Sequence, residues 1–192
     1  MALEIHDGIE LWKPETFDFA RALETGKYMR PMLATGDMTS TMALTPNRLY
    51  TVMWPLARAV TCDRIAMNVN VAAESGEKAR LGIYRDTGSY YPGALLLDAG
   101  EVDVATTGLK ALTVSLELDA GMYWVACISD GAPSVRYTFQ GLGLKGSIAM
   151  PRYSYAGYRT DTAYGPLPDP FPTGGADQDL WLALGLRYAA LR

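Results

Sequence analysis

The chain has few of the side chains that enzyme catalysis usually requires. Its one histidine, His6, lies close to the N-terminus, which argues against Ser-His-Asp, Cys-His and histidine-rich metal sites. Cys62 and Cys127 are far apart and lie in apolar segments, so they predict two reduced core thiols rather than a zinc site or a CxxC motif. No G-x-S-x-G or Walker A motif is present. The sequence therefore predicts no catalytic residue, no metal site and no cofactor.

Aspartates are the remaining candidates for acid–base chemistry. Glycoside hydrolysis needs only two carboxylates, so a glycan-cleaving enzyme stays open as an alternative. Aspartate also favours turns, because its side chain accepts hydrogen bonds from nearby backbone N–H groups, and we prefer this explanation. Residues 177–179 (DQD) offer two carboxylates to a cation but lack the DxDxDG loop of a calcium site. The candidate carboxylates are Asp86, Asp98, Asp103, Asp130 and Asp169.

Aromatic side chains in loops are better candidates for binding. The chain has 12 tyrosines and 4 tryptophans, and an aromatic ring with a polar edge suits both sugars and protein surfaces. Asp86, Tyr90 and Tyr91 belong to the turn-rich loop 86–93 (DTGSYYPG). We predict a shallow glycan site here, in which a ring covers the apolar side of a sugar and the carboxylate accepts from its hydroxyls. The alternative is that this loop only packs against a neighbouring segment.

Two further segments are predicted to form interfaces. Residues 13–26 (KPETFDFARALETG) predict a short helix that must pack on something to be stable. Residues 151–179 are rich in proline and tyrosine and show no clear strand, so we expect an excursion along a surface. A second copy could cover this excursion, or it could pack within its own chain. The expected interface residues are Phe17, Phe19, Leu23, Tyr153, Tyr155, Tyr158 and Phe171.

The elements that position these residues are predicted to be strands. Apolar and polar residues alternate with a period of two in many segments, which is typical of antiparallel strands with one buried face. Segments 49–54 and 122–128 are apolar on both faces and predict central strands. Eight to ten strands without intervening helices predict an all-β chain, an antiparallel jelly-roll-like β-sandwich. The alternating segments are 65–71, 79–85, 111–118, 135–140 and 180–188.

Length and charge set the expected organisation. The 192 residues suit one domain with an arm. Six of the 21 acidic residues but only two of the 17 basic ones lie in residues 1–24, so the body is neutral and offers no basic stripe for nucleic acid. No apolar run approaches the roughly 20 residues of a membrane helix, and the acidic start is unlike a secretory signal. We expect an arm over 1–43 with a short helix, for attachment and assembly, and a sandwich over 44–192 that includes the excursion 151–179.

Several segments in this order resemble a β-sandwich module of structural proteins from tailed bacteriophages and prophages. The segments are 44–50 (LTPNRLY), 63–69 (DRIAMNV), 79–86 (ARLGIYRD), 92–100 (PGALLLDAG), 121–126 (GMYWVA) and 164–172 (YGPLPDPFP). The resemblance covers about 40–188, and its motifs are structural rather than catalytic. Such proteins are commonly tail-fibre, minor-tail or receptor-binding components.

This resemblance implies a non-enzymatic virion structural protein that contributes to attachment to a host-surface glycan. It further implies assembly in the host cytoplasm, a final place on the virion surface, and a homo-oligomer, most commonly a trimer. The N-terminal arm would bind other virion proteins, without nucleic acid and without insertion into a membrane. A capsid-borne spike or decoration protein and, less favoured, a glycan-cleaving enzyme on the same sandwich remain the alternatives.

Overall fold

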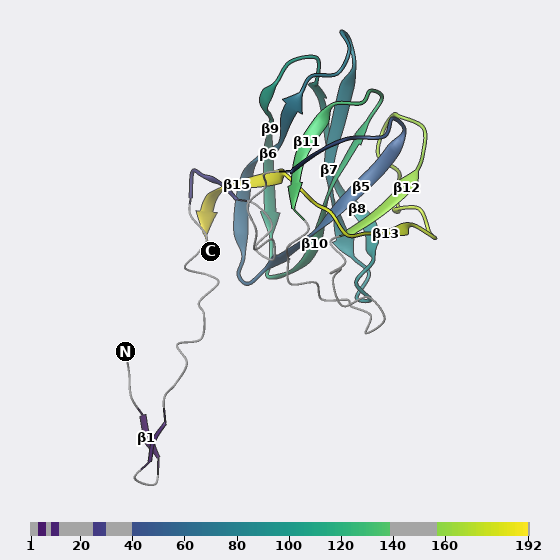
Figure 1. Ribbon diagram of the computed structural model, residues 1–192. Helices are drawn as coiled ribbons and strands as arrows, with labels where there is room; N and C mark the ends of the chain where they lie inside the picture. Colours follow the sequence, from purple (N-terminus) through teal and green to yellow (C-terminus); the bar gives the residue numbers. More distant parts are fainter. Residues whose placement is uncertain (1–3, 7–8, 12–24, 30–39, 139–156, 192) are drawn as a thin grey trace.

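The protein folds into two antiparallel β-sheets that enclose one apolar core (Figure 1). This computed structural model describes residues 4–6, 9–11, 25–29, 40–138 and 157–191. Within these ranges every named element is a strand, and no helix is long and apolar enough to cross a membrane. The prediction of an all-β, antiparallel chain is confirmed, and the arrangement is sandwich-like.

One sheet has six strands in the order β13-β12-β5-β10-β7-β8. Strands β5 and β10 lie at its centre and are buried on both faces, as their continuous apolar sequence predicted. Strands β12 and β13 fall inside the excursion 151–179, where the sequence showed no clear strand. The bounds are Arg48–Leu56 (β5), Lys78–Asp86 (β7), Pro92–Asp103 (β8), Gly121–Ser129 (β10), Gly157–Asp161 (β12) and Ala176–Gln178 (β13).

The other sheet has seven strands. Its path is β14-β11-β6-β15-β3, with β4 paired to β11 and β9 paired to β6. Strands β1 (Glu4–His6) and β2 (Ile9–Leu11) form a separate hairpin that lies apart from both sheets (Figure 1). The bounds are Tyr28–Met29 (β3), Ser40–Ala43 (β4), Val60–Val71 (β6), Gly108–Leu118 (β9), Ser134–Thr138 (β11), Trp181–Leu182 (β14) and Leu184–Leu191 (β15).

The core between the sheets follows the alternation in the sequence. Six apolar residues from alternating segments are at most 2% exposed: Ile65, Val69, Leu81, Ile83, Leu182 and Leu184. The corresponding residues of β9, Leu112, Val114 and Leu116, are only half-buried, because β9 lies at the edge of its sheet. Cys62 and Cys127 are buried free thiols, as predicted, and burial raises the pKa of both to about 12.

The expected arm over 1–43 needs correction near its C-terminal end. Thr25 forms a bridge with Tyr188, and β3 pairs with β15. Strand β4 pairs with β11 along its full length. Residues 25–29 and 40–43 therefore belong to the seven-stranded sheet, because their backbone groups complete its ladders. The predicted helix lies outside the described residues apart from its last two, and so do Phe17, Phe19 and Leu23.

One side-chain hydrogen bond joins the two sheets through the core. The indole Nε1–H of Trp54, from β5, donates to the hydroxyl of Tyr188, from β15, at 2.9 Å. Both side chains are at most 2% exposed. A buried donor that loses its acceptor keeps its full desolvation cost. This bond therefore helps to fix how the two sheets are positioned on each other.

We expect Tyr188→Phe to lower the free energy of unfolding by about 1–3 kcal/mol, because Trp54 Nε1–H would stay buried without its acceptor. Chemical denaturation followed by tryptophan fluorescence measures this change. Tyr90→Phe is the matched control, since Tyr90 is 46% exposed and its hydroxyl should contribute less than about 0.5 kcal/mol. Equal midpoints for the two variants would show that the bond does not stabilise the packed sheets.

Candidate functional site

The proline-rich loop 162–175 covers the outer face of the six-stranded sheet. Its apolar side chains Leu167 and Phe171 are 5% and 2% exposed. The ring of Phe171 meets that of Tyr84, on β7, edge to face with centroids 5.5 Å apart. The Tyr84 hydroxyl donates to the carbonyl oxygen of Pro168 at 2.9 Å. At Gly82, also on β7, a Cβ would collide with Leu167, so the loop lies directly on the backbone of the strand.

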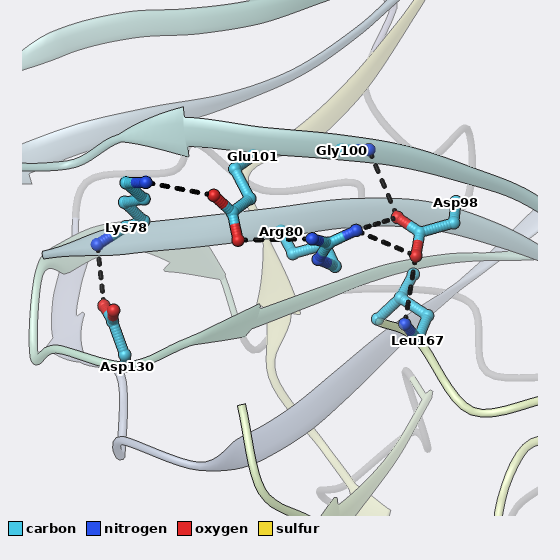
Figure 2. Close-up of polar contacts among 7 residues, drawn as sticks. All are labelled: Lys78, Arg80, Asp98, Gly100, Glu101, Asp130 and Leu167. Atoms are coloured by element: carbon cyan, nitrogen blue, oxygen red, sulfur yellow. Dashed lines mark hydrogen bonds and ion pairs between the residues drawn. The ribbon is translucent and has the colours of Figure 1, made fainter. Parts of the chain in front are cut away.

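A cluster of charged side chains fastens this loop to the sheet (Figure 2). Asp98, on β8, accepts a hydrogen bond from the backbone N–H of Leu167 at 3.0 Å and another from that of Gly100 at 3.2 Å. Both of its carboxylate oxygens also contact Arg80 Nη1, at 2.9 and 3.0 Å. The side chains of Arg80 and Asp98 are 18% and 22% exposed, so their pairing is partly shielded from water. One carboxylate thus connects β7, β8 and the loop.

Glu101 extends the cluster toward solvent. It contacts Arg80 Nη2 and Lys78 Nζ, each at 3.2 Å. The pKa of the Glu101 carboxyl lies below its usual value, first because Lys78 donates a hydrogen bond to it, with a smaller contribution from Arg80. The backbone N–H of Lys78 donates to Asp130 Oδ1 at 2.6 Å (Figure 2). Every charge in this cluster faces an opposite charge or a backbone donor, and the arrangement supports the fold rather than a reaction.

The predicted binding loop lies next to the proline-rich loop and packs on a cluster of aromatic rings. This cluster, called the aromatic base, consists of Tyr84, Trp124, Tyr158 and Phe171. The Tyr91 ring contacts the rings of Tyr158 and Phe171, with centroids 4.5 and 5.7 Å away. Its hydroxyl donates to the Pro172 carbonyl at 2.7 Å and accepts from the Gly175 N–H at 2.9 Å. Tyr91 therefore joins the two loops, which corresponds to the packing alternative rather than to a sugar contact.

Asp86 also stabilises the loop, through two hydrogen bonds that its carboxylate accepts. Its Oδ2 accepts from the indole N–H of Trp124 at 2.8 Å, and its Oδ1 accepts from the backbone N–H of Gly88 at 2.7 Å. These two bonds hold the start of the loop against β10. The carboxylate is half-buried, and each oxygen keeps a further lone pair for a ligand hydroxyl.

Tyr90 is the residue of the predicted trio that presents its ring to solvent. It is 46% exposed, whereas Asp86 and Tyr91 are half-buried. Its backbone φ is +56°, in the left-handed region that non-glycine residues rarely adopt, and Gly88 before it has φ of +89°. Such a backbone persists only where its surroundings fix it. The hydrogen bonds of Asp86 and Tyr91 hold the backbone at the two ends of the loop.

The structure places two of the expected interface residues inside the chain. Phe171 packs on Tyr84, and Tyr158 is 6% exposed, with its ring 5.5 Å from that of Trp124. Neither offers an exposed ring to a second copy, because both rings pack against other aromatic rings of the same chain. Tyr153 and Tyr155 lie outside the described residues.

The candidate carboxylates mostly act as acceptors for the backbone, which was the preferred explanation of their positions. Asp103 accepts from Ala105 N–H at 2.8 Å, two residues further along, as Asp86 and Asp98 do from Gly88 and Gly100. Asp130 and Asp169 accept from backbone N–H groups of β7 and β8. Among the described residues, no three His, Cys, Asp or Glu side chains are placed to hold a metal ion.

Sequence reasoning missed the aromatic base beneath the loop. The alternation of residues 79–85 puts Tyr84 on the same face as Arg80, opposite the core residues Leu81 and Ile83, yet Tyr84 is fully buried beneath the proline-rich loop. Trp124 was recognised as part of a central strand, but not as the donor to Asp86. The available signal was the apolar character of both faces of residues 122–128, which requires a second covering layer.

No protein-family model matches this chain, and no curated protein is similar enough to be identified as its relative.

We expect Asp98→Ala to lower the free energy of unfolding by about 2–3 kcal/mol, because Leu167 N–H and Arg80 lose a shared, partly buried acceptor. Glu101→Ala removes a carboxylate that is 32% exposed and should cost less than about 1 kcal/mol. Denaturant titration measures both values, and hydrogen exchange at the Leu167 amide should accelerate in the Asp98 variant alone. Equal losses of stability in the two variants would mean that the charges stabilise the protein and that the hydrogen bond from Asp98 to the loop does not.

Proposed function

We propose that this protein is a non-enzymatic virion structural protein of a tailed phage or phage-like particle. In this proposal it is a tail-fibre or receptor-binding component that contributes to attachment to a host-surface glycan. The resemblance of its strand and loop segments to phage sandwich modules supports the setting. The exposed ring of Tyr90, on a loop that is held at its two ends by Asp86 and Tyr91, is the observation that carries the binding role.

The loop has the properties that weak sugar recognition needs. A ligand that meets a loop whose backbone is already fixed does not have to order that backbone, which favours affinity. The Tyr90 ring can cover the apolar side of a sugar, and the Asp86 carboxylate lies four residues earlier in the same loop. A shallow contact of this kind binds in about the millimolar to micromolar range. Many copies on a particle would raise the overall strength.

The finer parts of the proposal concern architecture and assembly. We propose a jelly-roll-like sandwich with an N-terminal helical arm, assembled in the host cytoplasm and carried on the virion surface. Residues 1–24 would bind other virion proteins, an assignment supported by their concentration of acidic side chains. The resemblance further supports a homo-oligomer, most commonly a trimer.

We expect Tyr90→Ala to reduce adsorption of particles to host cells by about tenfold or more, through loss of the stacking surface at each of many sites. Folding should be unaffected, because the Tyr90 ring is already 46% exposed. Adsorption assays and glycan-array binding with the purified protein measure the effect. Tyr28→Ala is the matched control, an exposed tyrosine on the opposite sheet that should adsorb normally.

Normal adsorption by the Tyr90 variant would remove this loop from consideration as the binding site. Release of sugar fragments from a bound glycan would instead favour the enzymatic alternative. Electron microscopy of labelled particles would locate the subunit, and a position on the capsid would favour a spike or decoration protein over a tail component.

We expect deletion of residues 1–24 to leave a folded body that no longer joins the particle. The deletion stops before Thr25 and β3, whose bridge and ladder with β15 remain intact. A deletion through Met29 is the matched comparison, since it also removes that strand and should lower the melting temperature. Normal incorporation of the shorter deletion would contradict an attachment role for the first 24 residues.

A further inference from the structure

The carboxylate of Asp86 keeps part of its hydrogen-bonding capacity for a ligand. The protein supplies one donor to each of its oxygens: the Trp124 indole N–H to Oδ2 at 2.8 Å and the Gly88 N–H to Oδ1 at 2.7 Å. An ionised carboxylate only accepts, and it offers about four lone-pair positions. Asp86 is half-buried, so the carboxylate still meets solvent. A further position on each oxygen is therefore left for a donor of the ligand.

The loop closes on itself and so keeps Tyr90 near this carboxylate. Asp86 pairs with Pro92 where the ladder between β7 and β8 ends, and the Thr87 N–H donates to the Tyr91 carbonyl at 2.9 Å. The backbone of Tyr90, directly before Tyr91, is thereby brought back beside the start of the loop. Because the Tyr90 ring is 46% exposed, a small ligand can contact both the ring and the carboxylate.

The two free acceptor positions determine which polar groups fit. They belong to one rigid, planar group, so they suit two donors that are themselves neighbours. Adjacent hydroxyls on a pyranose ring are such a pair, and each can donate to one oxygen of Asp86. Hydrogen bonds to an ionised acceptor are about twice as strong as those between neutral groups. A sugar with two adjacent free hydroxyls therefore uses the site more fully than one with a single hydroxyl.

The charge of the site disfavours acidic ligands. Asp86 is the one charged residue of loop 86–93, and neither this loop nor the proline-rich loop 162–175 contains a lysine or an arginine. A carboxylate on the ligand would therefore meet Asp86 without a cation from either loop. Juxtaposed like charges across an interface are strongly unfavourable.

Arg85, the residue before the loop, is directed away from this carboxylate. Its partner in the ladder between β7 and β10 is Tyr123, whereas Asp86 is bonded to Trp124, the next residue of β10. Consecutive side chains of a strand point to opposite faces of the sheet. Arg85 and Asp86 therefore lie on opposite faces, and the arginine does not neutralise the site.

From these observations we propose that the ligand of the Tyr90 loop is a neutral sugar with two adjacent free hydroxyls. The two hydroxyls donate to Oδ1 and Oδ2 of Asp86, and the ring of Tyr90 covers an apolar face of the sugar. Sugars that carry a carboxylate are rejected by the charge of Asp86. This inference rests on the proposed function and specifies the class of glycan that the loop recognises.

The test compares sugars that differ in one charged group. Methyl glycosides of galactose, glucose and mannose are titrated into the full chain, each beside the uronate with the same ring. Nuclear magnetic resonance follows the Trp124 indole N–H and the Gly88 amide, because both donate directly to Asp86. At least one neutral glycoside should shift both resonances, with a dissociation constant in about the millimolar range. Its uronate should bind about tenfold more weakly or worse.

Single O-methylation of each ring hydroxyl in turn should identify two adjacent positions that are both required. Asp86→Asn removes the charge with little change in size, and circular dichroism checks that it folds. This variant should bind the neutral glycoside about tenfold more weakly and should lose the preference over the uronate. Asp103→Asn is the matched control and should keep both, since Asp103 caps its own turn at the opposite end of β8 from Pro92.

Three results would overturn the inference: no neutral glycoside shifts the two resonances, the uronate binds as tightly as its neutral partner, or Asp86→Asn keeps the preference. Adsorption of Tyr90→Ala particles tests the proposed function separately. If that variant loses adsorption while any of the three results is found, the loop binds a glycan of another class. Normal adsorption by that variant would instead contradict the proposed function itself.

Discussion

The central constraint in this protein is that the six-stranded sheet is apolar on both faces. Strands β5 and β10 bury almost every residue, so the sheet needs one cover from the opposite sheet and a second one from elsewhere. The proline-rich loop 162–175 is that second cover. It can lie flat on β7 because Gly82 has no side chain there, and Asp98 and Tyr84 bind its backbone. Without it, a row of aromatic rings would face water.

This covering layer also explains how loop 86–91, the proposed binding loop, is held at one end of the sheet. The Tyr91 hydroxyl bonds to the backbone at Pro172 and Gly175, so loop 86–91 and the proline-rich loop stabilise each other. Their shared aromatic packing lets Tyr90 hold a left-handed backbone and an exposed ring at low further cost. Tyr91 therefore stabilises the two loops, whereas its neighbour Tyr90 keeps an exposed ring.

The sequence predicted those parts of the fold that follow from period-two burial. Strands β6, β7, β9, β10 and β15 were anticipated because one of their faces, or both, must be apolar. Strand β8 was missed because its three register shifts break the alternation of residues 92–103. Strands β12 and β13 were missed because prolines surround them, and a short ladder can form between prolines without leaving a pattern. At the candidate site, the separate contacts of Asp86, Tyr90 and Tyr91 depend on tertiary structure that no local sequence pattern encodes.

The two faces of the molecule differ in how completely the chain satisfies its own surfaces. On the six-stranded sheet, the edge strand β8 is bulged and charged, and the outer face is covered by the proline-rich loop. On the seven-stranded sheet, the short strands β3 and β4 complete some ladders, while the apolar residues Leu112, Val114 and Leu116 of β9 stay half-buried. The Tyr90 loop belongs to the sheet whose outer face is already covered, so a contact at that loop would leave the aromatic rings beside it packed as they are.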